Sequence, residues 1–211
     1  MVFRAQRRHE EQLEALGVTP NYSCVSYLYQ NVPRFGEILG WAESSAVIWA
    51  NSVAGARTNR NSIMMDVCQA VTGLTPEFGY LRDEHRRGQL LVRLDVQRMD
   101  AAALGFLVGR LAVDRVPVLE HWPFTQAELK NMGAAMASSG AVTMYHVIGV
   151  TPEARDAAMA FGGRPHGRPR GGERRRARDG LVARVAAGIR KPADPARQPR
   201  LFRGRVGGSA R

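Results

Sequence analysis

The sequence has few cysteines and no long apolar run. Cys24 and Cys68 are the two cysteines among 211 residues, too few for a disulfide framework, so we expect both thiols to be reduced, as they are in the cytoplasm. The sequence contains no run of 18 apolar residues, the length that a membrane-spanning helix needs. The basic start MVFRAQRR is not followed by the apolar segment of a secretory signal. The sequence therefore predicts a cytoplasmic protein that does not span a membrane.

Acidic and aromatic residues are scarce in the last quarter of the chain. Residues 162–211 hold 14 Arg and one Lys against three acidic residues, a net charge of +12, whereas residues 1–161 carry a net charge of −1. Phe202 is the one aromatic residue of this tail. A segment so poor in apolar side chains cannot bury enough surface to offset its ordering entropy, so we expect it to be disordered. We therefore divide the chain into a globular domain over 1–161 and a basic tail over 162–211.

Two interpretations of the tail are open. Arg, Gly, Pro and Ala dominate it, and GC-rich codons specify these residues, so an out-of-frame reading of a GC-rich gene would produce this composition. The alternative function is that of a nucleic-acid-binding protein acting through the tail, for which the charge suffices. Because Phe202 is the one aromatic side chain of the tail on which a base could stack, we favour the first interpretation and do not expect a nucleic-acid partner.

Helical and extended patterns alternate along residues 1–161. Asp100 is placed to cap one helix, Thr125 and Glu128 form a capping box for another, and Ser44 is able to cap a third. Strands that alternate with helices indicate an α/β layered domain. We predict helices over 3–16, 36–41, 44–53, 60–71, 100–113 and 125–138 and from 151 onward, and strands over 90–96, 116–119 and 142–150.

Polar residues crowd around Gly55, directly after an apolar segment. Glycine lets the backbone approach a ligand closely, arginine offers a bidentate fork for a carboxylate or phosphate, and short polar side chains supply fixed hydrogen bonds. Such a set suits a site for a small anion. The alternative is a helix C-terminus followed by a polar surface loop. The residues concerned are Asn51, Ser52, Arg57, Thr58, Asn59 and Arg60.

Two blocks of sequence resemble a known family. The second block reads YHVIGVTPEA at 145–154. The first comprises YSC at 22–24, NVP at 31–33, GE at 36–37, WAESSAV at 41–47, ANSV at 50–53 and GARTN at 55–59. In this order and spacing the blocks resemble the aconitase X family, over roughly residues 3–161.

The resemblance implies a fold and an activity. Members of this family are hydro-lyases similar to aconitase, known as cis-3-hydroxy-L-proline dehydratases in bacteria and mevalonate 5-phosphate dehydratases in archaea. Both kinds of dehydratase remove water from a small anionic hydroxy substrate. By this resemblance the chain is a truncated catalytic large part of such a dehydratase, with an aconitase-like layered α/β domain, and we favour hydroxyproline over phosphomevalonate as its substrate.

The resemblance also implies site residues. Cys24 matches the family's cysteine in its motif and is expected to bind an iron–sulfur cluster, whose iron polarises the leaving hydroxyl as a Lewis acid. Without such a resemblance, a lone cysteine is more often a small buried residue. Arg57 is expected to clamp the substrate carboxylate or phosphate. We assign catalytic roles to Ser52, Arg57 and Thr58, and substrate binding to Asn51, Arg57, Asn59, Glu43 and Ser44.

Three residues have competing interpretations. Glu43, at a helix start, is also a favourable partner of the helix dipole. His146, in an apolar strand pattern, could be catalytic, but a satisfied core histidine is the more common case. Cys68 falls on the apolar side of the predicted helix 60–71 and outside both blocks, so we expect it in the core.

The chain also departs from the family pattern. The family's large part has further sequence and further cysteines on both sides of the matched region. The base that takes the substrate proton is expected on a smaller swivelling domain or separate subunit. Iron–sulfur clusters need three or four ligands in most cases, so the two cysteines of this chain cannot complete one. We therefore expect the chain to be inactive without its partner.

Overall fold

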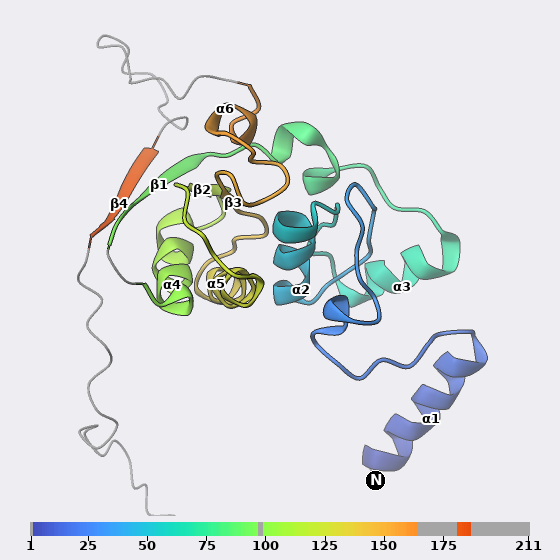
Figure 1. Ribbon diagram of the computed structural model, residues 1–211. Helices are drawn as coiled ribbons and strands as arrows, with labels where there is room; N and C mark the ends of the chain where they lie inside the picture. The colour runs from blue at the N-terminus through green and yellow to red at the C-terminus, as the bar shows by residue number, and fades with distance from the viewer. Residues whose placement is uncertain (1, 97–98, 164–180, 187–211) are drawn as a thin grey trace, which may run out of the picture.

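The computed structural model of the chain describes residues 2–96, 99–163 and 181–186 (Figure 1). Four short strands form one sheet with the order β3-β2-β1-β4, in which every neighbouring pair is parallel. They are β1 (Leu90–Asp95), β2 (Pro117–Leu119), β3 (His146–Val147) and β4 (Leu181–Ala186).

The α-helices lie beside this sheet and extend away from it (Figure 1). They are α1 (Val2–Ala15), α2 (Ser44–Trp49), α3 (Ile63–Thr72), α4 (Ala101–Ala112), α5 (Gln126–Ser139) and α6 (Ala157–Ala160). Short 3-10 turns follow at η1 (Ser26–Leu28), η3 (Gly79–Leu81) and η4 (Asp83–His85), and η2 (Ala50–Ala54) is a π-helical turn. Parallel strands with helices packed against them confirm the predicted α/β class. None of the described helices is both long and apolar enough to cross a bilayer.

Helices α4 and α5 form the closest helix pair of the core. A Cβ atom added at Gly105 would lie 2.2 Å from the backbone oxygen of Met132, so only glycine permits this approach. The cap predictions for both helices are confirmed: Asp100 accepts a hydrogen bond from Ala103 N at 2.8 Å, and Thr125 and Glu128 form the capping box. These local signals set where the two helices begin because they satisfy N–H groups that have no partner within the helix.

The segment before α2 differs from its prediction. No helix forms over 36–41; instead Ile38 pairs with Arg57 in an isolated parallel bridge, and Leu39 N donates to Arg57 O at 2.9 Å. The chain is extended here because the returning loop offers it backbone partners. Ser44 does not cap α2 either, because the Glu43 carboxylate accepts hydrogen bonds from Ser45 N and Ala46 N at 3.0 and 2.6 Å.

The predicted strand 142–150 is also shorter than its sequence pattern. Only His146 and Val147 pair with β2, because the neighbouring β2 itself has only three residues. The helix expected from residue 151 is absent: Thr151 Oγ1 accepts a hydrogen bond from Val147 N at 3.0 Å and closes a turn. The next helix, α6, begins after Asp156, which caps it through Met159 N at 2.7 Å.

The apolar side of α3 is not part of the core. Cys68 is exposed, which corrects its expected core position, and Ile63 and Val67 are 72% and 48% exposed. The buried residue of this helix is Gln69. Periodicity places apolar residues on one side of a helix, but it does not say whether other elements cover that side.

Of the basic tail, the structure describes Gly162, Gly163 and residues 181–186. Residues 181–186 form β4, which pairs with β1 from Leu90↔Leu181 to Asp95↔Ala186. The predicted disorder is therefore wrong for these six residues, because the edge of β1 supplies backbone partners that the composition of the tail does not reveal. The rest of 164–211 lies outside the described residues.

Candidate functional site

The polar segment after α2 turns back on itself at Gly55. Helix α2 continues into the π-helical turn η2, a feature that occurs often at functional sites. Gly55 then adopts φ +68°, and an added Cβ atom would lie 2.5 Å from the Phe35 ring. Both the left-handed backbone and the close contact require glycine here. The turn brings Thr58 back beside Asn51.

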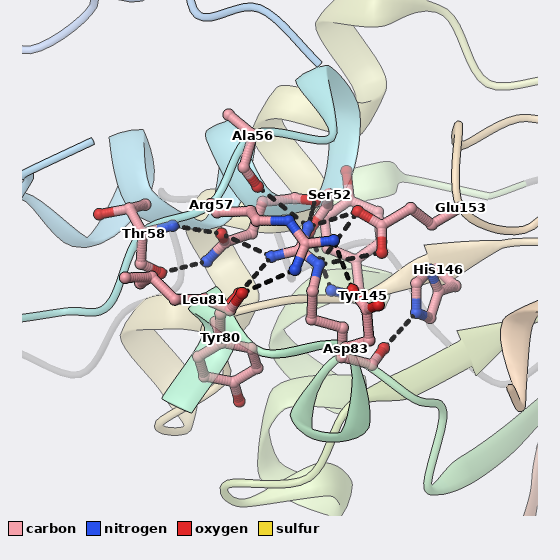
Figure 2. Close-up of polar contacts among 12 residues, drawn as sticks. Ser52, Ala56, Arg57, Thr58, Tyr80, Leu81, Asp83, Tyr145, His146 and Glu153 are labelled. Carbon is pink, nitrogen blue, oxygen red and sulfur yellow. Dashed lines mark hydrogen bonds and ion pairs between the residues drawn. The ribbon is translucent and has the colours of Figure 1, made fainter. Parts of the chain in front are cut away.

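Asn51 is the central residue of this loop, of which Figure 2 labels Ser52, Arg57 and Thr58. Its amide nitrogen donates to the backbone oxygens of Thr58 and Thr143 at 2.9 and 3.1 Å. Its amide oxygen accepts from Thr58 N at 3.0 Å and from Arg86 at 3.2 Å. An asparagine side chain has two donors and one acceptor oxygen with two lone pairs, so all of its hydrogen-bonding capacity is used inside the protein.

The other short polar residues are likewise buried and partnered. Ser52 Oγ accepts from Tyr145 N at 2.9 Å, which joins the two sequence blocks. Thr58 Oγ1 donates to Asn59 O at 3.2 Å. Asn59 donates to Phe78 O at 3.0 Å and accepts from Tyr80 N at 2.8 Å. The structure thus brings the predicted residues together, and in this chain their side chains hold backbone segments in place.

Arg57 lies at the surface of this network. Its guanidinium donates to Leu81 O at 2.7 Å and to the Asp83 carboxylate, and the Arg57 side chain is 26% exposed. The hydrogen bond and positive charge of Arg57 lower the pKa of Asp83. A ligand anion would have to compete with the exposed Asp83 carboxylate for this cation. Arg57 is nevertheless more accessible than the buried Asn51, Ser52, Thr58 and Asn59.

A buried ion pair that the sequence did not single out, Arg86 with Glu153, supports the loop. Arg86 is 2% exposed, and its guanidinium donates to both carboxylate oxygens of Glu153. It also donates to the backbone oxygens of Asn51, Ala56 and Tyr80 at 3.0, 3.0 and 2.9 Å. One cation therefore fixes both ends of the turn at Gly55 and links them to the second block. In the sequence, the one feature that pointed to this ion pair was the position of Glu153 in the second block. Arg86 gave no such indication, because it stands in a charged stretch typical of an exposed surface.

Cys24 and Glu43 lie apart from this network, in the wall of a cavity of about 500 Å³. Cys24 is exposed. The Glu43 carboxylate is occupied as the α2 cap, while Ser44 is the first residue of that helix. Asp66 lies in the same wall, and burial raises its pKa. None of the described residues that line this cavity is Lys or Arg.

The described residues do not complete an iron–sulfur site. Among them, no group of three or more His, Cys, Asp or Glu side chains is placed to hold a metal ion. Cys24 is the one cysteine of the cavity, since Cys68 lies on α3 and does not line it. Most clusters need three or four protein ligands, so we derive no chemical step through a cluster in this chain.

His146 is buried, but its ring is only half satisfied. One ring nitrogen, Nε2, lies 2.8 Å from Arg86 O, whereas Nδ1 has no hydrogen-bond partner among the described residues. Burial lowers the pKa of this histidine. The expected core position is therefore confirmed, but not the expectation that both ring nitrogens are satisfied.

Comparisons with known proteins agree with the resemblance seen in the sequence. Residues 1–84 match the family model of the aconitase X first domain, and residues 88–170 match that of the aconitase X second domain.

The similar proteins include cis-3-hydroxy-L-proline dehydratase of Pseudomonas aeruginosa, 44% identical over 156 residues, which are 71% of this chain and 27% of that protein. The phosphomevalonate dehydratase large subunit of Methanothermobacter thermautotrophicus is 45% identical over 158 residues, 74% of this chain and 40% of that subunit. The crystal structure of Thermococcus kodakaraensis aconitase X in its holo-form superposes with a TM-score of 0.72 at 31% identity, covering 87% of this chain and 44% of that one.

This chain thus spans less than half the length of these relatives. The two family models nevertheless follow one another along most of it, from residue 1 to residue 170. The chain therefore belongs to the aconitase X family.

Proposed function

We propose that this chain forms part of a dehydratase that removes water from a small anionic hydroxy compound, cis-3-hydroxy-L-proline or mevalonate 5-phosphate. The observation that carries the proposal is the similarity to relatives named for these two dehydrations, over more than 150 residues in each case. The aligned length amounts to most of the part that the structure describes, so the likeness extends beyond any single motif.

The charge of the cavity at Cys24 favours hydroxyproline as the substrate. Its wall contains Glu43 and Asp66, and no described Lys or Arg balances them there. A phosphate ester would bring several negative charges towards these carboxylates, whereas an amino acid also carries a positive ammonium group. Like charges in a partly desolvated site repel one another strongly.

Dehydration breaks a C–H and a C–O bond on adjacent carbons, so the complete enzyme needs a base and a group that activates the leaving hydroxyl. We propose Cys24 as one ligand of an iron–sulfur cluster, with the remaining ligands supplied from outside this chain. We further propose that Arg57, which does not line the cavity at Cys24, holds the substrate anion in the complete enzyme, with Asn51, Ser52, Thr58 and Asn59 keeping its loop in place.

A second polypeptide would complete this enzyme. Archaeal relatives are named as large subunits, and a large subunit implies a small one. We propose that a small subunit or swivelling domain supplies the base that takes the substrate proton.

A chimera tests the proposed function directly. Residues 3–161 of this chain would replace the matching region of the Pseudomonas aeruginosa dehydratase, and loss of cis-3-hydroxy-L-proline would be followed by chromatography. We expect the chimera to dehydrate hydroxyproline, and Arg57→Lys in it to lower kcat/KM at least tenfold, because a lysine cannot reproduce the planar two-bond grip on a carboxylate. The exposed Arg110→Lys serves as the matched control. A folded chimera without any turnover would refute the proposal.

A further inference from the structure

The two matched domains differ in the apolar surface that they expose. Of the 22 large apolar side chains that are exposed in the described part of the chain, 17 belong to the first domain and five to the second. Apolar side chains scattered singly over a surface are ordinary, whereas contiguous exposed patches mark interaction sites. The excess in the first domain is therefore informative where its members share one face.

The polar side of α3 faces the rest of the first domain. Gln69 is only 9% exposed, and its amide nitrogen donates to Thr75 Oγ1 at 2.7 Å. A Cβ atom added at Gly40 would lie 2.3 Å from Gln69 Oε1 and 3.6 Å from Asp66 Oδ1. Asp66 and Gln69 are three positions apart and so lie on one side of the helix. That side, which carries a charge and an amide, is the one packed against Gly40.

The apolar side of α3 faces away from the domain. Ile63, Val67 and Val71 recur every four residues and form one stripe along the helix. All three are exposed, Val71 to 79%, and Met64 beside them is 71% exposed. Figure 1 shows α3 at the edge of the molecule, away from the sheet. An amphipathic helix normally turns its apolar stripe towards a core, so α3 is reversed, and no described element covers its stripe.

The basic tail offers little that could cover this stripe. Residues 164–180 contain no large apolar side chain, and residues 187–211 contain four. The matched relatives, in contrast, have more than half of their length outside the region that this chain matches. Permanent interfaces are the most hydrophobic class, because they resemble a domain core cut in half. An uncovered apolar stripe therefore fits a permanent contact with a further part of such a protein.

We propose that the apolar stripe of α3 is an interface for the part of an aconitase X protein that lies outside the two matched domains. That part would present an apolar groove to Ile63, Val67 and Val71, since anchors at this spacing are the means by which an amphipathic helix binds a groove. The proposal rests on membership of the family and not on the proposed dehydration, and its test measures no turnover.

Hydroxyl-radical labelling of methionines tests the proposal. It is applied to the full 211-residue chain and to the chimera with the Pseudomonas aeruginosa dehydratase, and mass spectrometry identifies the labelled residues. We expect Met64 to be labelled about tenfold more slowly in the chimera, because the core of an interface loses most of its exposed area. Met159 in the second domain, which is 42% exposed, is the control and should keep its rate. Equal labelling of Met64 in both proteins, or equal protection of Met159, would overturn the proposal.

A matched pair of variants locates the contact on α3. Val71→Lys should restore the labelling of Met64 in the chimera and lower its thermal midpoint, but leave the midpoint of the chain alone unchanged, because Val71 is exposed there. Leu111→Lys is the control, since Leu111 is likewise exposed at the last turn of a helix, α4, and it should affect both proteins equally. An unchanged chimera in Val71→Lys would contradict the interface.

Two other outcomes are also decisive. Protection of Met64 in the chain alone that grows with concentration would assign the stripe to a second copy and overturn the proposal. Should the chimera fail to fold, hydrogen exchange of the matching helix in the natural dehydratase decides, and exchange as fast as in the chain alone would overturn it. A folded chimera with protected Met64 but no turnover would refute the proposed dehydration and support this interface.

Discussion

Replacing Glu153 by glutamine should destabilise the folded chain far more than the same replacement at an exposed position. Glu153 neutralises Arg86, and their side chains are 18% and 2% exposed. Removing one partner of a buried ion pair costs about 3–5 kcal/mol because the other charge stays buried without compensation. Glutamine keeps one acceptor oxygen, so we expect a loss of about 3 kcal/mol.

Urea unfolding followed by circular dichroism measures this loss. With a slope of about 2 kcal/mol per M, the midpoint should fall by about 1.5 M. Glu84→Gln is the matched control, because the Arg82–Glu84 pair is 50% and 44% exposed, and exposed pairs contribute only about 0.2–1 kcal/mol. Equal midpoints for the two variants would refute the view that the Arg86–Glu153 pair supports the loop.

Three further changes test other parts of the structure. Gly55→Ala should lower the unfolding free energy by about 1–3 kcal/mol, since φ +68° is strained for alanine and its Cβ atom would meet the Phe35 ring. Thermal unfolding measures this loss, and an unchanged midpoint would contradict the left-handed turn. The pKa of His146 is lowered in the folded chain, so as the pH falls the histidine of the unfolded chain is protonated at a higher pH than that of the folded chain. The free energy of unfolding should therefore fall as the pH drops below about 6.5. In His146→Gln this part of the pH dependence should vanish, and a profile identical to that of the unaltered chain would show that another group titrates. Cys24 and Cys68 are both exposed, so both should react with a thiol reagent in the folded chain; protection of Cys68 until unfolding would place it in a core after all.

Local chemistry in the sequence was sufficient to predict the elements whose stability is local. Asp100 and the Thr125–Glu128 capping box satisfy the first N–H groups of their own helices, and such caps act over three or four residues. The strand at 90–96 was visible for a similar reason, because its alternating, half-buried pattern LLVRLDV is a property of neighbouring residues. The family was also visible, since its motifs are short runs of neighbouring residues.

Only the tertiary structure decided what those residues contact. Arg86 looks like one more surface charge in the sequence, yet it is buried because Asn51, Ala56, Tyr80 and Glu153 converge on it from segments up to 67 residues away. Cys68 has the periodicity of a core residue but is exposed, because no described element covers its side of α3. Periodicity and capping reflect interactions between near neighbours in the chain, whereas burial and ion pairing depend on which distant segments meet.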